Sequence, residues 1–174
     1  MNRTNHQNSL RETLMINLVR YSKPLYGLFF KSKAEPWELS VLALLQYPQQ
    51  SLGRELGLFL VANRLKLMDK FEDHDVYHVL LQYSTSVVDE ARMQFFLLGN
   101  GKRSLFALGT GFIASCFFPE RWGAFYEAYK RGQHSGVVFK SDFLLGLNQP
   151  INDLRSYFQI EEHPAFSASS IPFA

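Results

Sequence analysis

Cysteine is almost absent from this chain, because Cys116 is the only one among 174 residues. An internal disulfide framework is therefore excluded, and the cysteine usage is compatible with a reducing compartment. Cys116 is flanked by apolar residues, so we expect it to be a small buried hydrophobe. The first ten residues, MNRTNHQNSL, hold no apolar stretch of the kind that a secretory signal needs. These features predict a cytoplasmic protein.

Long hydrophobic runs are also missing. The best candidate, 105–118, is shorter than the about 20 apolar residues that a membrane-spanning helix needs. A buried or an interfacial helix fits this segment better. Lys102 and Arg103 precede it and Arg121 follows it, an arrangement that suits a membrane interface and equally suits an ordinary solvated helix boundary.

Neither sign of charge dominates, since 18 Lys and Arg residues face 16 Asp and Glu residues and leave a net charge of +2. This excess is too small to indicate a nucleic-acid-binding protein, and we expect no nucleic-acid partner. Aromatic residues are abundant by contrast, with 16 Phe and 8 Tyr. A Phe-rich core would explain them, and an oversized apolar pocket lined by aromatic side chains is the alternative.

Apolar residues recur at helical spacing along most of the chain, and alternating strand patterns are scarce, which predicts an all-α fold. A length of 174 residues is typical of one domain. We predict a flexible N-terminus over residues 1–9, a single-domain helical bundle over 10–160, and an irregular C-terminal tail over 161–174.

Local signals place the individual helices. Predicted helices cover 10–30 with a bend at Pro24, the stretch from Pro36 to the Pro-Gln-Gln at 48–50, a segment capped by Ser51, 74–83, 86–98, 105–118, a segment opened by Pro119, 142–147 and 150–158. Ser86 and Asp89 have the spacing of a capping box. Gly132 is predicted to follow the last residue of the helix that begins at Pro119.

Metal-binding chemistry is concentrated in one place, around His74 and His78. Four residues apart, these imidazoles lie on one face of a helix. With a carboxylate they form a ligand set that suits zinc and its neighbours in the first transition row. Glu90 follows His78 by twelve residues, about 18 Å along a straight helix, whereas ligand bonds to zinc are about 2 Å. The helix must therefore end and a second one turn back, which the Ser-Thr-Ser at 84–86 allows.

Asp75 leaves three roles open. It points about 100° away from His74 around a helix, and it could be a metal ligand, a group that holds an imidazole, or a general base. Zinc proteases place Glu directly after the first His; here Asp stands there and no matching downstream ligand pattern follows, which argues against a protease. The alternative without a metal is a solvated, polar helix start.

Four segments together resemble the coenzyme Q biosynthesis protein 4 family. His74-Asp75-x-x-His78, eleven residues and then Glu90 is similar to the family's metal motif. The flanking segments follow in the family's order and cover about residues 51–160: Leu-Gly-Arg at 52–54, Ala-Tyr-Lys-Arg-Gly at 128–132 and Pro-Ile-Asn-Asp-Leu-Arg at 150–155. The chain departs from the family's patterns in two places, with Gln-Tyr-Ser at 82–84 for a Gly-Tyr-Gly-like turn and Asp-Phe at 142–143 for Trp-Glu.

The resemblance implies an all-helical fold with an apolar lipid-binding groove. It implies zinc bound by His74, Asp75, His78 and Glu90, with Asp75 and Glu90 as the candidate catalytic residues. The implied work is oxidative decarboxylation of a prenylated hydroxybenzoate in ubiquinone biosynthesis. We further expect peripheral association with a membrane surface, a homodimer, and other quinone-biosynthesis proteins or a polyprenyl lipid as partners.

Three functions follow as hypotheses. The first is a metal-dependent decarboxylase and hydroxylase of prenylated hydroxybenzoate. The second is a non-catalytic prenyl-lipid-binding scaffold for a quinone biosynthetic complex, in which the metal is structural. The third is a helical metallophosphohydrolase, which usually needs further His and Asp ligands; the one upstream histidine, His6, lies in the polar N-terminus.

Overall fold

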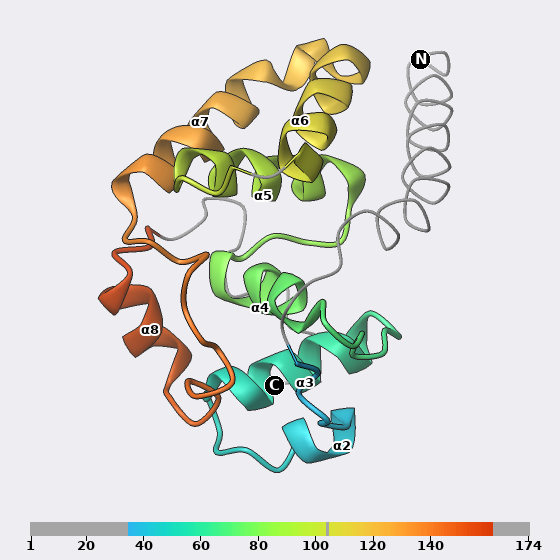
Figure 1. Ribbon diagram of the computed structural model, residues 1–174, viewed down its shortest axis with the longest axis vertical. Coiled ribbons are helices and arrows are strands. Elements are labelled where there is room, and N and C mark those ends of the chain that lie inside the picture. Colours follow the sequence, from blue (N-terminus) through green and yellow to red (C-terminus); the bar gives the residue numbers. More distant parts are fainter. Residues whose placement is uncertain (1–34, 104, 162–174) are drawn as a thin grey trace, which may run out of the picture.

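Helices follow one another through the residues that the computed structural model describes, 35–103 and 105–161 (Figure 1). They are α2 (Val41–Leu44), α3 (Leu52–Ala62), α4 (Glu72–Leu81), α5 (Val87–Gly99), α6 (Leu105–Phe117), a 3-10 turn (Pro119–Arg121), α7 (Trp122–His134) and α8 (Ile151–Tyr157). Apart from one isolated bridge between Ser51 and Pro150, these ranges contain no β-structure. The prediction of an all-α, single-domain fold is confirmed. Within the same ranges, no helix is long and apolar enough to span a bilayer.

Helix α4 lies in the middle of the elongated molecule, between α5, α6 and α7 at one end and α2 and α3 at the other (Figure 1). A large apolar core runs along it and includes Leu56, Tyr77, Leu80 and Phe96, all buried. A smaller cluster fills the space between α5, α6 and α7. Its members are Ala91, Ala114, Phe118 and Phe125. Several of the abundant aromatic residues therefore belong to the core.

Serine caps begin two of the helices that matter for the site. The Ser51 hydroxyl accepts a hydrogen bond from the Arg54 amide at 3.3 Å, as the sequence predicted, and each such cap contributes about 1 kcal/mol. The Ser86 hydroxyl accepts from the Asp89 amide at 3.2 Å. The second hydrogen bond of the predicted capping box, from the Ser86 amide to the Asp89 side chain, is wrong. The Asp89 carboxylate accepts hydrogen bonds from Ser84 instead.

Three predictions about the helices are wrong. The helix expected from Pro36 begins only at Val41, because residues 35–40 are not helical, Glu38 has a φ of 53°, and the Trp37 amide donates to the Glu72 carboxylate at 3.0 Å. The segment 142–147 forms turns rather than a helix. Gly132 does not follow α7 but lies inside it, where it packs directly against the backbone of α5.

Among the side chains of α6 that the structure describes, Ala114 packs in the smaller core, as does Phe118 just after the helix, whereas Phe112 is exposed. Cys116 lies one turn after Phe112 and is also exposed, so the expectation that it is buried is wrong. The predicted helix at 10–30 and the C-terminal tail beyond Glu161 lie outside the described residues.

Candidate metal centre

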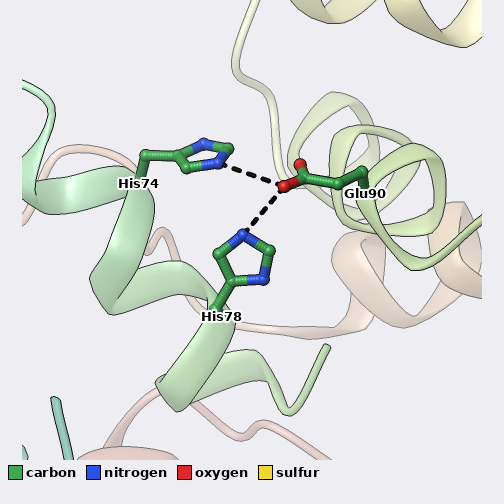
Figure 2. A group of neighbouring side chains, drawn as sticks. All are labelled: His74, His78 and Glu90. Carbon is green, nitrogen blue, oxygen red and sulfur yellow. Dashed lines mark hydrogen bonds and ion pairs between the residues drawn. The ribbon is translucent and has the colours of Figure 1, made fainter. Parts of the chain in front are cut away.

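The site is built on the turn that joins α4 to α5. Helix α4 ends at Leu81, and Gln82 adopts a left-handed conformation with φ 62° and ψ 46°. Helix α5 starts after Ser86 and brings Glu90 to the side of α4 that carries His74 and His78 (Figure 2). The reversal required by the spacing of the histidines and Glu90 is therefore confirmed, and it occurs at the predicted place.

His74, His78 and Glu90 come together across this turn as a group that could hold a metal ion (Figure 2). One ligand atom of each lies within 4.8 Å of the others. The Glu90 Oε1 atom is 3.1 Å from His78 Nε2 and 3.5 Å from His74 Nε2. Ligands at about 2.1 Å from a tetrahedral zinc ion are about 3.4 Å apart, so these separations fit such an ion.

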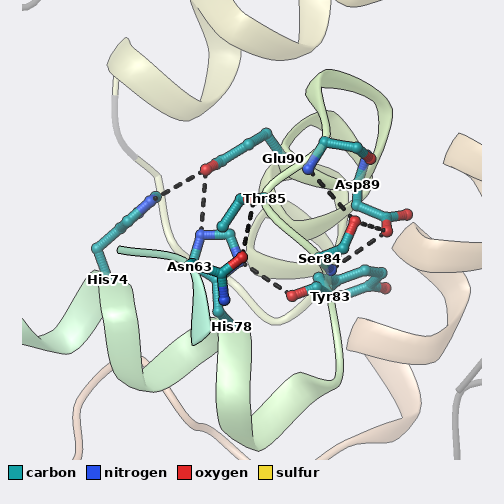
Figure 3. Close-up of polar contacts among 9 residues, drawn as sticks. Asn63, His74, His78, Tyr83, Ser84, Thr85, Asp89 and Glu90 are labelled. Carbon is teal, nitrogen blue, oxygen red and sulfur yellow. Dashed lines mark hydrogen bonds and ion pairs between the residues drawn. The ribbon is translucent and has the colours of Figure 1, made fainter. Parts of the chain in front are cut away.

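A hydrogen bond and a stacking contact fix the orientation of the His78 imidazole. Its Nδ1 atom lies 3.1 Å from the Tyr83 carbonyl oxygen, and its ring stacks on Phe59 with centroids 5.3 Å apart. Because a carbonyl oxygen can only accept, Nδ1 carries the hydrogen. In the neutral imidazole Nε2 is then a lone-pair acceptor that faces the carboxylate of Glu90 (Figure 3). Two acceptors at 3.1 Å require a positive centre, either a proton or a metal ion.

The turn itself is fixed by short polar contacts (Figure 3). The Ser84 hydroxyl donates to the Asp89 carboxylate at 2.6 Å, and the Ser84 amide donates to the same oxygen at 3.2 Å. The Thr85 hydroxyl reaches the Asn63 side chain at 3.4 Å, which links the turn to the end of α3. These contacts hold the start of α5, and with it Glu90, at a set distance from α4.

Asp75 lies beside the group without joining it. Its carboxylate is not among the mutually close ligand atoms of His74, His78 and Glu90. Burial raises the pKa of Asp75, and the two imidazoles partly oppose this rise. A carboxyl group with a raised pKa is suited to moving a proton. The predicted ligand and catalytic roles of Asp75 remain predictions.

The pKa shifts of His78 and Glu90 reflect the pairing of their charges. Burial alone would lower the pKa of His78, but the hydrogen bond and charge of Glu90 and the bond to the Tyr83 carbonyl raise it. Burial would raise the pKa of Glu90, yet the hydrogen bonds and charges of His74 and His78 bring it far below its ordinary value. Both shifts favour a proton on the His78 imidazole as the positive centre when no metal is bound.

This pairing predicts a pH dependence of stability without metal. A raised His78 pKa contributes stability that is complete below the ordinary value of about 6.5 and is lost as pH rises through the folded value. The Glu90 contribution is present throughout this range, because it is lost only as pH falls through the depressed pKa. We expect the melting temperature in EDTA to fall as the pH rises above about 6.5.

Zinc should reverse this trend, since metal binding needs a neutral imidazole and strengthens as pH rises. Melting curves in EDTA and in zinc, followed by circular dichroism, test both statements. The His78→Ala variant is the control and should lose this contribution to the pH dependence in EDTA. A melting temperature of the wild type in EDTA that rises over the same pH range contradicts the pairing.

Two arginines that could have bound a substrate carboxylate contact the backbone instead. Arg155 donates to the carbonyl oxygens of Val79 at 2.9 Å and Leu80 at 3.2 Å. Arg131 donates to the Leu81 carbonyl at 3.0 Å. Both therefore cap the C-terminal end of α4, where cations are favoured by the helix dipole.

Three contacts of the site were missed by sequence reasoning: the stacking of Phe59, the carbonyl of Tyr83 and the cap provided by Arg131. The first comes from α3, where Phe59 showed only the spacing of a core residue. The second is a backbone atom, and no residue type reveals which carbonyl a turn will direct at a side chain. The Ser-Thr-Ser at 84–86 signalled the turn, but not which of its carbonyls would face His78.

The arrangement is open on one side. The His78 side chain is 2% exposed, whereas those of His74 and Glu90 are 35% and 34% exposed. If this group held a metal ion, its three ligands and its access from solvent would leave a further coordination position, as in catalytic rather than structural zinc sites.

Comparison with known proteins bears on the fold. The sequence matches no protein-family model and no curated protein. A crystal structure of a "putative ubiquinone biosynthesis protein" from Nostoc punctiforme is similar, with a TM-score of 0.59 over 91% of this chain and 87% of that chain. Sequence identity is 18%, so the likeness shows a shared fold.

Proposed function

We propose that this chain binds zinc through His74, His78 and Glu90 and uses the site to hold a prenylated aromatic precursor in ubiquinone biosynthesis. The proposal of a metal rests on two acceptors, His78 Nε2 and Glu90 Oε1, that lie 3.1 Å apart. The other ring nitrogen of His78 donates to the Tyr83 carbonyl. The pathway is suggested by the name of the Nostoc punctiforme protein that shares the fold.

A prenyl tail needs apolar surface, and α3 and the segment after it carry exposed apolar side chains. In α3, Phe59 stacks on His78. Val61 is 55% exposed, Leu65 40% and Met68 52%. Ligand sites combine such apolar surface with a few fixed polar groups, here the metal ligands.

The chemistry proposed at the site is loss of the ring carboxyl group. Zinc, when bound, acts as a Lewis acid toward a carboxylate oxygen. Asp75 is the proposed group that gives or takes a proton, a role supported by the rise of its pKa on burial. Zinc has no redox chemistry, so dioxygen and a reductant or partner enzyme must supply the oxygen atom and electrons for ring oxygenation.

Incubation of the zinc-loaded protein with a prenylated hydroxybenzoate and a reductant under air, with detection of released carbon dioxide, tests this proposal. Wild type should release it, and Glu90→Gln should not. Retention of the prenylated acid by wild type without carbon dioxide release would instead favour the scaffold function. Neither retention nor release, in a protein that holds zinc, would refute the prenyl-quinone function.

Membrane association is proposed for the exposed face of α6 and α7. Phe112 is 72% exposed, Trp122 60% and Tyr126 61%, and aromatic residues of this kind favour the membrane–water interface. Arg103 and Arg121, both exposed, lie at the two ends of α6 and suit anionic headgroups.

Flotation with vesicles that contain phosphatidylglycerol tests this surface. Wild type should float with the vesicles, and Phe112→Ser should remain largely unbound. Stability should change little, because Phe112 is mostly exposed. Leu42→Ser, at a position 73% exposed on α2, is the matched control and should float like wild type. Equal flotation of Phe112→Ser and wild type would contradict the assignment of this face.

A further inference from the structure

The C-terminal end of α4 has a partner for each of its last four carbonyl groups. His78 accepts from the turn, through the amides of Gln82 and Tyr83. The carbonyls of the next three residues, 79–81, accept from the guanidinium groups of Arg155 and Arg131. Carbonyls at a helix end have no partner within the helix, so these bonds fix where α4 stops and where the turn begins.

Arg131 differs from Arg155 in what else it touches. It projects from α7 and is 9% exposed, and its guanidinium carbon lies 5.5 Å from the centroid of the Tyr83 ring. Its other donors reach the Glu161 carbonyl oxygen, at 2.9 Å from Nε and 2.6 Å from Nη2. The Tyr83 ring is 1% exposed and packs against Phe96 as well, with ring centroids 6.5 Å apart. Arg131 thus contacts both the last residue of α4 and the side chain of Tyr83.

We propose that Arg131 and Tyr83 are positioning residues for the metal ligand His78, an inference that rests on the proposed zinc site. The ring of Tyr83, clamped by Arg131, sets the orientation of its own backbone carbonyl. That carbonyl accepts from His78 Nδ1 and thereby directs Nε2 at the metal position. Partners that orient a ligating imidazole in this way typically contribute 10–100-fold to metal affinity.

Arg131→Met and Arg155→Met form a matched pair that tests this inference. Both remove a cap from the same helix end and should lower stability, but of the two it is the Arg131 guanidinium that lies over the Tyr83 ring. Zinc affinity, measured by competition with a chromophoric chelator, should fall about 10–100-fold in Arg131→Met and stay unchanged in Arg155→Met. Equal affinities in the two variants, whether lowered or not, would overturn the inference. If Arg131→Met does not fold, Arg131→Lys takes its place, because Lys keeps the charge but not the flat fork of donors.

The tautomer of His78 gives a second readout that needs no metal. Nitrogen-15 NMR in EDTA, above the pKa of the ring, should show the Nδ1–H form in wild type and in Arg155→Met, and a mixture of forms in Arg131→Met. A single Nδ1–H form in all three proteins would overturn the positioning role. A wild type that binds no zinc but shows the expected tautomers would refute the zinc site and leave the positioning role supported.

Discussion

Replacing His78 with alanine should weaken zinc binding about 100–1000-fold. Structural zinc sites bind with about 10–16 kcal/mol shared among their ligands, so the loss of one ligand removes several kcal/mol, and each 1.4 kcal/mol is a factor of ten. Glu90→Gln should have a similar effect with less disturbance of packing, because the amide keeps the size of the carboxylate but not its charge. Metal content after dialysis, followed by competition titration, measures both variants.

His134→Ala is the matched control, since His134 is exposed at the end of α7 and lies outside the metal group. It should bind zinc like wild type. Asp75→Asn extends the series: wild-type affinity would exclude Asp75 as a ligand, and a loss comparable to that of Glu90→Gln would place it in the ligand set. Equal zinc content in wild type and His78→Ala would refute the site.

The metal group could be predicted because its spacing is constrained by helix geometry. Two histidines four residues apart must share a face, and Glu90 can meet them only if the chain reverses, so the residues alone required a turn near 84–86. The structure has this turn. What the sequence could not provide is the orientation of the rings, because that depends on Phe59 from another helix and on the direction of one backbone carbonyl.

The errors in the fold have a common physical origin. Gly132 has the local pattern of a helix end, yet it lies within α7 because α5 crosses there. The segment 35–40 has the sequence of a helix start, yet it is not helical, because the Trp37 amide donates to the buried carboxylate of Glu72 on α4. In both places a contact between segments distant in sequence overrides a local preference, and local preferences are all that a pattern of residue types contains.

Replacing Gly132 with alanine adds one methyl group to α7, and we expect no other added methyl group in this helix to destabilise the protein as much. A Cβ at this position would overlap the Phe96 carbonyl oxygen and lie 3.0 Å from the Asn100 amide nitrogen, both of them backbone atoms of the α5 segment. No side chain can rotate away, so α5 and α7 must move apart along a buried contact. The Asn100 side chain, which donates to the Gly132 carbonyl at 3.1 Å, would lose its position as well. We expect a loss of about 3 kcal/mol or more in the free energy of unfolding.

Gly123→Ala on the same helix is the control, because among the residues that the structure describes no atom from outside this stretch of helix lies within 4 Å of the added Cβ. Alanine is favoured over glycine in a helix by up to about 1 kcal/mol, so this variant should be as stable as wild type or slightly more stable. Urea unfolding followed by circular dichroism compares the two. If both variants unfold at the same urea concentration, α5 and α7 do not approach each other at Gly132 as closely as the Cβ contacts above require. If only Gly132→Ala is destabilised, this glycine is required for the close approach that brings Arg131, its neighbour in sequence, to the end of α4.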